Sequence, residues 1–478
     1  MKRQGLRRMK VSFKRHNLYL LFIAAWLFFL CGGGTKALAL SIEEERKMGE
    51  QFFLQISNTF QLVEDDFANT YINDLGEYLL SSLETRPFPF RFYIINENDL
   101  NAFAGPGGHI FFFTGLIEVM EDVDELAAVM AHEIAHVSAR HLAERMEQNT
   151  KMQLATLAGL LLGALVGGEA RGAIMTGSMA AVMQKQLAYS RDDERQADQL
   201  GYKYMSAAGF DPSAMILTLK KIQKGQMMHP NQIPAYLLTH PGGAERMANY
   251  DTMMSGDKPI QEKGETQKFR HFYPIFKTIL RAKYMESSDA ERTFKRELAK
   301  DPDSIWAHFG LGIVLRKRRE YQAAVDHFHE ALRRRPQSLF ILRNLAEAYQ
   351  MMGREDEAIA LLSEALRLDP GDRSSLFLLA LSYQNIEAYR EAIPIYERLT
   401  SMAPVKNEVF YNLGISYGRM NRLAQAHYNF GIYFKKEGKI GKARFHFEKA
   451  KELSKDDPAL GERIEKAQRD LIKESKPL

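Results

Sequence analysis

The sequence predicts a mainly α protein of two domains: an N-terminal α+β domain in which helices surround a small sheet, and a C-terminal superhelix of stacked helix pairs. Three observations predict this. The chain has 478 residues, more than a single hydrophobic core usually organises. Two short strand-like segments lie among helical patterns in the first half. Prolines in the second half recur every 34 residues, which is the period of TPR helix pairs.

The composition is that of an ordinary globular protein. Hydrophobic residues make up 45% of the chain and charged residues 26%, which argues against a disordered or uniformly apolar chain. The net charge is +4, and a cluster of lysines and arginines within the first 15 residues accounts for the excess. Because the rest of the chain has no such excess, we do not expect nucleic-acid binding.

Residues 1–39 have the pattern of a cleaved export signal. The basic stretch is followed by an apolar run from Leu18 to Leu30 and by Ala37-Leu38-Ala39, a small-x-small signal-peptidase site. An uncleaved membrane anchor is the alternative, although the run is shorter than the roughly 20 residues that a spanning helix needs. Cys31 does not predict a lipoprotein, because the bulky Leu30 stands where lipidation favours a small residue.

Cysteine usage limits the chemistry of any metal site. Cys31 is the only cysteine, and it would leave with the signal. The mature chain would then form neither disulfide bonds nor thiolate metal sites. A metal ion must therefore be held by histidines and carboxylates.

The N-terminal domain is predicted to span residues 40–254, and its helices are indicated by apolar residues at three- and four-residue spacings. This pattern covers residues 41–58 and 67–83. A stretch rich in Ala, Glu, Leu and Met, 121–147, predicts one long helix that begins near two aspartates.

Two strands are predicted just upstream of this long helix. They cover residues 90–95 and 109–114, and the Gly- and Pro-rich residues 104–108 form a turn before the second strand. We expect His109 to be an exposed residue at the start of that strand.

An apolar segment, Leu154–Val166, follows the long helix and has two interpretations. It is too short to cross a bilayer unaided. A buried helix of the N-terminal domain is favoured, and a mobile lid or a hairpin that contacts the membrane surface is the alternative.

Residues 255–270 are polar and lack an apolar period, so we predict a linker there and a repeat domain over 271–475. The repeats are clearest over 305–452. A small residue recurs in the first helix of each unit and a large residue in the second, so that helices approach closely and the large side chain fills the gap between units. The prolines in register are Pro302, Pro336, Pro370 and Pro404.

The motif His132-Glu133-Ile134-Ala135-His136 lies within the predicted long helix. Residues four apart lie on one face of a helix, so His132 and His136 can share one metal ion. Neutral imidazoles suit zinc, and the neighbouring Glu133 can take a proton from water as it attacks a peptide carbonyl.

A third ligand is predicted further along the chain. Glu194 and Asp198 are one helical turn apart, so Glu194 is positioned to bind the metal and Asp198 to accept a hydrogen bond from a ligating imidazole. The alternative is that Glu194, like Asp193, is a solvated charge on the helix. Glu194 is favoured as a ligand because only it pairs with Asp198 at the spacing of one turn. His141, five positions after His136, is expected to point away from the metal face and to serve in packing or hydrogen bonding.

These motifs resemble the M48 family of zinc peptidases, within the gluzincin group, and the repeat tail is similar to that of its bacterial periplasmic members. The resemblance implies that His132, His136 and Glu194 bind one zinc ion, that Glu133 is general base and acid, and that Asp198 supports the metal site. The segments that carry it are 101–108, 132–141, 190–201 and 239–246.

The resemblance also implies roles for His240 and Arg246. Both match positions that face the active site, where they would stabilise the oxyanion. Alternatively, His240 would occupy the fourth position of the metal in a resting form, and the sequence does not decide between these roles.

The expected function is an exported, periplasmic zinc endopeptidase that cleaves unfolded or misassembled envelope proteins. Its TPR groove would recruit substrate or an outer-membrane assembly partner, and peripheral membrane contact is left open. We expect the strand 109–114 to hold an extended substrate by main-chain pairing. The alternatives are a TPR chaperone or scaffold with a repressed or idle metal site, and a metal-dependent hydrolase of another substrate class.

Overall fold

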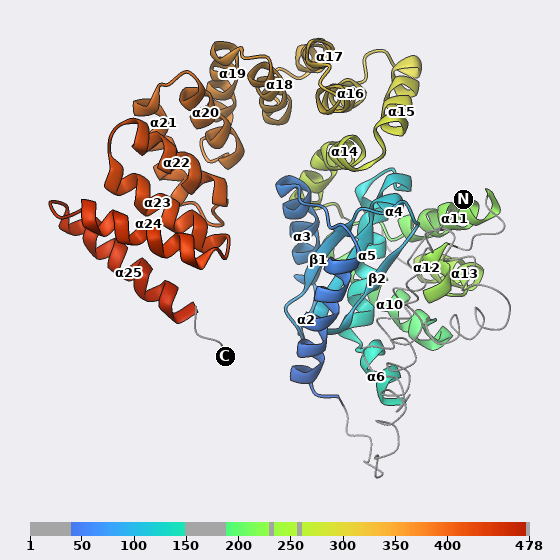
Figure 1. Cartoon of the computed structure of the whole chain (residues 1–478). Helices are drawn as coiled ribbons and strands as arrows, with labels where there is room; N and C mark the ends of the chain where they lie inside the picture. Colours follow the sequence, from blue (N-terminus) through green and yellow to red (C-terminus); the bar gives the residue numbers. More distant parts are fainter. Residues whose placement is uncertain (1–39, 149–187, 229–233, 256–260, 475–478) are drawn as a thin grey trace, which may run out of the picture.

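The computed structural model describes residues 40–148, 188–228, 234–255 and 261–474. Figure 1 shows helices around a small sheet, followed by an arc of helix pairs, which confirms the predicted fold class. The predicted export signal, 1–39, and the apolar segment Leu154–Val166 lie outside the described residues. Among the helices that are described, none is long and apolar enough to span a membrane.

Nine helices are described in the N-terminal part, and several begin at a capping side chain. Ser41 and Ser190 each close a capping box at the start of α2 and α10, and Asp122 caps α5. The helices are α2 (Ile42–Thr59), α3 (Asp66–Leu80), α4 (Thr114–Val119), α5 (Val123–Ser138), α6 (His141–Gln148), α10 (Arg191–Ala208), α11 (Ala214–Met228), α12 (Ala235–Thr239) and α13 (Gly243–Met254).

Within the described residues the sheet has three strands, in the order β1-β3-β2. β1 (Arg91–Ile95) is parallel to β3 (His109–Phe113), and β2 (Ala102–Ala104) is antiparallel to it. β2 was not predicted. Because β3 is paired on both sides, its main chain is not free to bind a peptide, so the expectation that this strand holds the substrate is wrong.

The two faces of β3 pack against different helices, as the two-residue period of a strand requires. Ile110 and Phe112 belong to the cluster that includes α3 and α5. Phe111 and Phe113 pack with Phe52 and other α2 residues. The sheet is therefore enclosed between α2 on one face and α3 with α5 on the other.

His109 is buried, which contradicts the prediction of an exposed strand residue. Its ring stacks on Phe53 and on Tyr93, with centroid distances of 5.6 and 5.7 Å. Burial, together with the nearby Arg91 guanidinium, lowers the pKa of His109 to about 4. The residue is therefore a neutral part of the packing between α2 and the sheet.

The long helix predicted over 121–147 is two helices. α5 ends at Ser138, and Arg140 adopts a left-handed conformation with φ of 56° before α6 begins. That conformation is uncommon for a residue with a side chain. Glu45 on α2 fixes it, since its carboxylate accepts hydrogen bonds from Arg140 at 3.0 and 3.2 Å.

Twelve described helices form the C-terminal part. The first of them, α14, begins within the predicted linker. The helices are α14 (Gly264–Tyr284), α15 (Ser287–Lys300), α16 (Ile305–Lys317), α17 (Tyr321–Arg334), α18 (Leu339–Met351), α19 (Glu355–Leu368), α20 (Arg373–Asn385), α21 (Tyr389–Thr400), α22 (Asn407–Arg419), α23 (Leu423–Lys436), α24 (Ile440–Leu453) and α25 (Pro458–Glu474).

Close approach of paired helices explains the recurring small residues of the repeats. A Cβ atom added to Gly312 on α16 would lie 2.6 Å from the ring of Phe328 on α17. The equivalent contact in a later unit joins Gly414 and Phe430 at 2.9 Å. Real Cβ atoms do not come this close, so the small residue is required for the large ring to fill the space between the helices.

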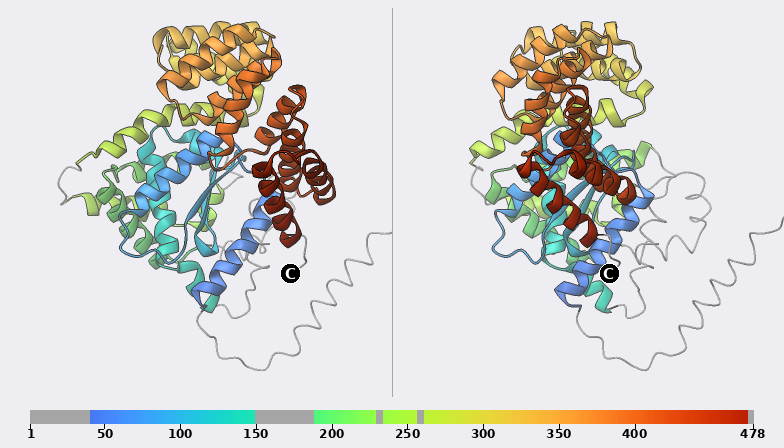
Figure 2. Two further views of the ribbon diagram at one scale, coloured as in Figure 1. Left: turned by 90° about the vertical axis from the view of Figure 1, so that its left-hand side faces the viewer. Right: turned by 60° about the vertical axis from the view of Figure 1, so that its left-hand side comes forward.

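The arc of repeats curves back towards the N-terminal domain (Figure 2), and two of its contacts with that domain are at the start of α3. Phe67 lies 4.5 Å from Phe340 of α18 between ring centroids. Asp66 forms a 2.6 Å ion pair with Lys406, which precedes α22. Repeats that are distant in sequence therefore meet the same short segment of the N-terminal domain.

Candidate metal centre

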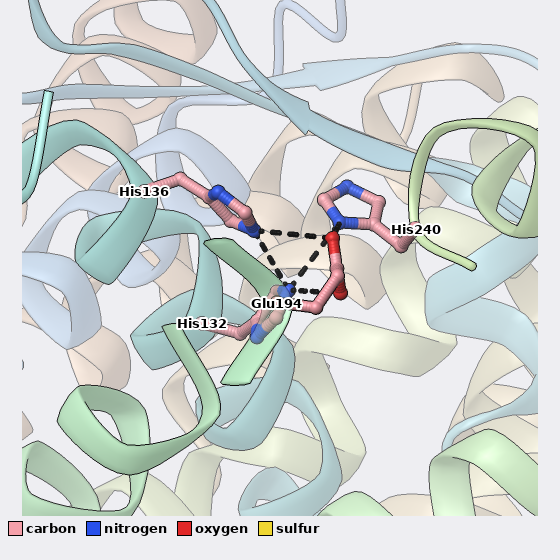
Figure 3. A group of neighbouring side chains, drawn as sticks. All are labelled: His132, His136, Glu194 and His240. Atoms are coloured by element: carbon pink, nitrogen blue, oxygen red, sulfur yellow. Dashed lines mark hydrogen bonds and ion pairs between the residues drawn. The ribbon is translucent and has the colours of Figure 1, made fainter. Parts of the chain in front are cut away.

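Four segments bring the predicted site residues together, and Figure 3 shows four of these residues: His132, His136, Glu194 and His240. α5 supplies His132, Glu133 and His136, and α10 supplies Glu194 and Asp198. His240 follows the last residue of α12, and Arg246 lies on α13.

α5 and α10 pack closely enough to bring their side chains together. A Cβ atom on Gly201 of α10 would lie 3.3 Å from the backbone nitrogen of His132. A larger residue at this position would push the two helices apart. Gly201 therefore helps to set the distance between the two halves of the site.

Histidine nitrogens and one carboxylate form a compact cluster. His132 Nε2 is 3.0 Å from His136 Nε2 and 3.4 Å from Glu194 Oε2. His240 Nδ1 is 2.9 Å from Glu194 Oε1 and 3.3 Å from His132 Nε2. One ligand atom from each of the four residues lies within 4.8 Å of all the others.

These separations fit a single tetrahedral metal ion. Bonds of about 2.0–2.1 Å to zinc place the ligand atoms roughly 3.3 Å apart, and the four pairwise distances, 2.9, 3.0, 3.3 and 3.4 Å, lie close to this value. The residues are buried, with His132 and His240 0% exposed and Glu194 2% exposed. Burial of so many polar atoms is costly unless they are paired or bind a cation, and Glu194 Oε2 has an ion pair with Arg246 but no hydrogen bond within the described part of the chain.

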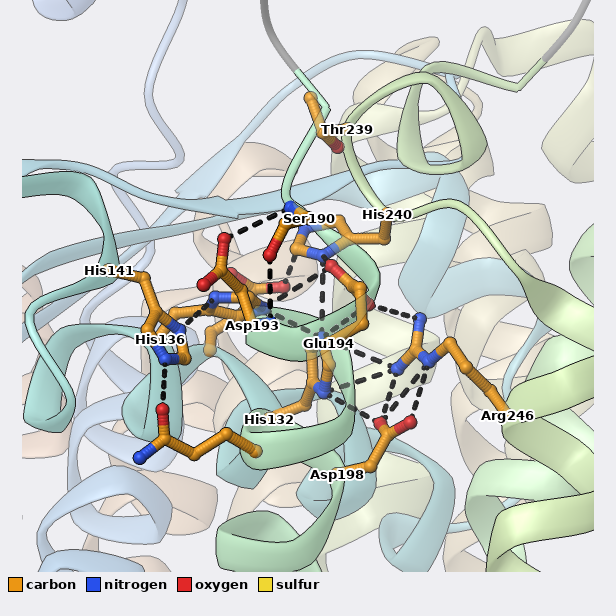
Figure 4. A network of polar contacts seen from close by, with 12 residues as sticks. His132, His136, His141, Ser190, Asp193, Glu194, Asp198, Thr239, His240 and Arg246 are labelled. Carbon is orange, nitrogen blue, oxygen red and sulfur yellow. Dashed lines mark hydrogen bonds and ion pairs between the residues drawn. The ribbon is translucent and has the colours of Figure 1, made fainter. Parts of the chain in front are cut away.

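Asp198 and Arg246 support one side of the cluster (Figure 4). Asp198 Oδ1 lies 3.0 Å from His132 Nδ1, and the Arg246 guanidinium donates to the same carboxylate at 2.7 and 2.9 Å. Arg246 Nη1 also lies 3.0 Å from Glu194 Oε2. This arrangement leaves the Nε2 atom of His132 directed at the cluster.

The carboxylates of the site are held in their ionised form. Burial alone would raise the pKa of Glu194, but His240 and Arg246 hold it well below the ordinary value. Burial likewise opposes ionisation of Asp198, yet Arg246 and His132 lower its pKa. The site therefore presents negative charge to a cation without the need for a carboxylate to lose a proton.

Glu133 lies against the cluster and has no strong partner. It is 0% exposed, and its Oε1 is 3.4 Å from His240 Nε2. Neither of its carboxylate oxygens accepts a hydrogen bond from another described residue. A buried carboxylate in this condition is available to accept a proton from a molecule bound beside the cluster.

Three contacts of the cluster were not predicted. Tyr189 stacks on His136 at a centroid distance of 3.9 Å, and Tyr236 stacks on His240 at 4.5 Å. His141 hydrogen bonds to His136 through their Nδ1 atoms, 2.9 Å apart. His141 is indeed a hydrogen-bonding residue, but it reaches His136 because the helix ends between them.

Comparison with known proteins decides the family of the N-terminal domain. The model of peptidase family M48 matches residues 67–254. These residues form a peptidase family M48 domain. Tetratricopeptide repeat models match 303–371, 375–405 and 424–457, which confirms the predicted repeats. The chain therefore carries a metallopeptidase domain followed by TPR repeats, and the M48 family together with the cluster indicates a divalent metal site.

Two curated relatives resemble the M48 half of the chain. The beta-barrel assembly-enhancing protease of Escherichia coli (strain K12) is 34% identical over 231 residues, which cover 48% of this chain and 47% of that protein. The mitochondrial metalloendopeptidase OMA1 of Saccharomyces cerevisiae is 29% identical over 183 residues, covering 37% of this chain and 50% of that protein. The chain thus spans about half the length of these relatives.

Solved structures also resemble part of the chain. The crystal structure of MamA protein covers 33% of this chain and 85% of its own, with 22% identity and a TM-score of 0.30.

Proposed function

We propose that the protein is an exported zinc endopeptidase that cleaves unfolded or misassembled envelope proteins. The single observation that carries this proposal is the buried cluster of His132, His136 and Glu194 with the unpaired Glu133 carboxylate beside it. Export rests on the pattern of residues 1–39, and the domain division remains that predicted from the sequence: 40–254, a linker over 255–270, and repeats over 271–475.

The metal would be one zinc ion held by His132, His136 and Glu194. Nitrogen and carboxylate ligands in tetrahedral spacing suit zinc, and the chain offers no thiolate among its described residues. Zinc bound there supplies Lewis acidity, which makes water a stronger acid and polarises the carbonyl group of a peptide bond.

Glu133 moves the proton. Its carboxylate accepts a proton from the attacking water and then donates it to the nitrogen of the departing amine, so that the residue ends the cycle ionised. The absence of a hydrogen bond to either oxygen from the described residues supports this role, because the carboxylate can then accept a proton from a molecule bound beside the cluster.

His240 is proposed as the fourth ligand of a resting form. Its Nδ1 atom lies within 3.3 Å of His132 Nε2 and 2.9 Å of Glu194 Oε1, where a fourth ligand atom is expected. Substrate would have to displace this imidazole to reach the metal. Release of His240 would then be a step that controls activity.

Arg246 is proposed as a positioning residue, not as a group that contacts the oxyanion. Its guanidinium is 2% exposed and is directed at Asp198 and Glu194. A side chain held by two buried carboxylates is poorly placed to stabilise a further negative charge.

The substrate is proposed to pair with β2 in an extended conformation. β2 lies at the edge of the sheet formed by the described residues, next to α5, and its three residues are buried, so a substrate must first gain access to this edge. The carbonyl of Asn101 and the amide of Gly105 form hydrogen bonds with β3. In an antiparallel pair, every second residue directs its amide and carbonyl away from the partner strand. The amides and carbonyls of Ala102 and Ala104 therefore point away from β3. Main-chain pairing requires an unfolded segment, which supports unfolded or misassembled proteins as the substrate class.

The TPR repeats are proposed to recruit either the substrate or an outer-membrane assembly partner. Stacked helix pairs present an extended surface suited to protein segments. The name of the Escherichia coli relative, a beta-barrel assembly-enhancing protease, supports a partner of this kind.

A chaperone or scaffold with a repressed metal site is the second candidate. The observation that favours it is the complete burial of the site, since His132, Glu133 and His240 are all 0% exposed. The unpaired Glu133 favours the enzyme, because a scaffold has no use for a buried base.

A comparison of cleavage by wild type and by Glu133→Gln distinguishes the two candidate functions. The substrate is an unfolded outer-membrane protein, and the zinc content of both proteins is measured. If the protein is an enzyme, Glu133→Gln is expected to keep its zinc, and its cleavage rate is expected to fall by at least about a hundredfold. Equal cleavage by both proteins would remove Glu133 from the mechanism, and no cleavage by either, with zinc bound, would favour the scaffold.

A further inference from the structure

A chain of two hydrogen bonds runs from the exposed Gln196 on α10, through the buried His141, to the buried His136. Gln196 Oε1 lies 2.8 Å from His141 Nε2, and His141 Nδ1 lies 2.9 Å from His136 Nδ1. Both histidines are 1% exposed. Figure 4 shows His141 beside His136, on the side of that ring away from Glu194.

The chemistry of the atoms fixes the direction of these hydrogen bonds. The Nε2 atom of His136 faces Glu194 and His132, so it must be free of a proton to bind a cation there, and the ring then carries its proton on Nδ1. That proton is donated to His141 Nδ1. His141 must then carry its own proton on Nε2, which it donates to the Gln196 carbonyl oxygen.

The backbone is shaped to present His141 in this position. Arg140 is left-handed, and this turn brings His141 back beneath His136. The Arg140 guanidinium is held by Glu45, which is 3% exposed, and donates to the Leu40 carbonyl at 2.6 Å. The first turn of α2 thus anchors the turn that carries His141.

We propose that His141 and Gln196 are positioning residues that hold His136 in the one tautomer and ring orientation able to bind the metal. The proposal rests on the metal site of the proposed function. His132 is oriented by the ionised Asp198, whereas His136 is oriented by a neutral relay. Acceptors of this kind fix the tautomer of a ligating histidine and strengthen its bond to the metal.

Zinc affinity, measured on the full chain by competition with a chromophoric chelator, tests the relay directly. His141→Leu removes the acceptor, and we expect it to weaken zinc binding by about 10–100-fold. His141→Asn places an amide oxygen near the former Nδ1 position, and we expect it to restore most of that affinity. Restoration by Asn is not expected if His141 only fills space.

Gln196→Leu keeps the volume of the side chain and removes only the hydrogen bond to His141. We expect a loss of zinc affinity of about tenfold. Arg195→Leu is the matched control on the same helix, because Arg195 is exposed like Gln196 but its contacts are with Arg191 and Asp192 instead of His141. We expect the affinity of this control to equal that of wild type.

The absorption spectrum of the cobalt-substituted protein gives a second readout. The visible bands report ligand geometry, so His141→Leu and Gln196→Leu should shift them and Arg195→Leu should not. If His141→Leu fails to fold, as judged by circular dichroism, Gln196→Leu decides the question.

The outcomes separate this inference from the proposed function. Tight zinc binding by wild type that neither His141→Leu nor Gln196→Leu changes by more than twofold, with unchanged cobalt spectra, would overturn the relay and leave the metal site intact. A wild-type protein without measurable zinc affinity would overturn the metal site and the relay together.

Discussion

Replacement of Arg246 by Met is expected to destabilise the N-terminal domain strongly. Arg246 is the cation that faces two ionised and buried carboxylates, Asp198 at 2.7 Å and Glu194 at 3.0 Å. Removal of one partner from a buried ion pair leaves an uncompensated charge, which costs roughly 3–5 kcal/mol. For a domain of this size that corresponds to a fall in melting temperature of roughly 6–20 °C.

Differential scanning calorimetry of the zinc-loaded full chain measures this change. Bound zinc partly compensates the negative charge of Glu194. The expected loss of stability therefore lies towards the lower end of the range and comes mainly from the unpaired charge of Asp198. Adding Asp198→Asn to Arg246→Met removes the stranded charge and should recover part of the loss. Arg195→Met is the control, because Arg195 forms an exposed ion pair with Asp192, and such pairs contribute little.

The same measurement separates the two roles considered for Arg246. A positioning residue that neutralises Asp198 and Glu194 must affect stability in the absence of substrate. A residue that acts only on the oxyanion would leave stability unchanged and lower catalysis alone. An Arg246→Met protein that melts within about 2 °C of wild type yet is inactive would refute our interpretation.

Two further predictions concern packing and pH. Gly312→Ala should destabilise the repeats by about 1–3 kcal/mol, because its Cβ atom would lie 2.6 Å from Phe328; Gly441→Ala, which meets nothing within 4 Å, should be neutral in the same urea titration. Burial raises the pKa of Asp65, but the Lys283 ammonium at 2.7 Å holds it below the ordinary value. This ion pair therefore adds stability at neutral pH that is lost as the pH falls through the lowered pKa of folded Asp65, so the difference in urea unfolding between wild type and Asp65→Asn should shrink steadily as the pH falls below the ordinary pKa of aspartate. A difference that stays constant from neutral pH into this acidic range would contradict this.

Local sequence patterns were sufficient to predict those parts of the site in which helical geometry alone determines which side chains lie together. His132 and His136 are four residues apart on one helix, and so are Glu194 and Asp198, so each pair had to share a face. The repeat period was readable for the same reason, since each TPR unit packs mainly on its neighbours. The meeting of α5 with α10 could be anticipated only through the resemblance to the M48 family.

Features that depend on contacts distant in sequence were missed. The helix break at Arg140 could not be read locally, because Arg140 is an ordinary helix former and is held by Glu45, far away in the sequence. The position of His141 beside His136 depends on that break. β2 has only three residues, too few for an alternating pattern, and without it the central place of β3 in the sheet could not be recognised.

Zinc stoichiometry of three proteins tests the central claim most directly. Wild type, Glu194→Gln and Asp193→Asn are dialysed against metal-free buffer and analysed by atomic emission. Asp193 is the matched control, because it neighbours Glu194 on α10 but accepts its hydrogen bond from the backbone of Ser190. The account predicts one zinc ion per chain in wild type and Asp193→Asn and a large loss in Glu194→Gln. Full zinc in Glu194→Gln, or none in wild type, would contradict it.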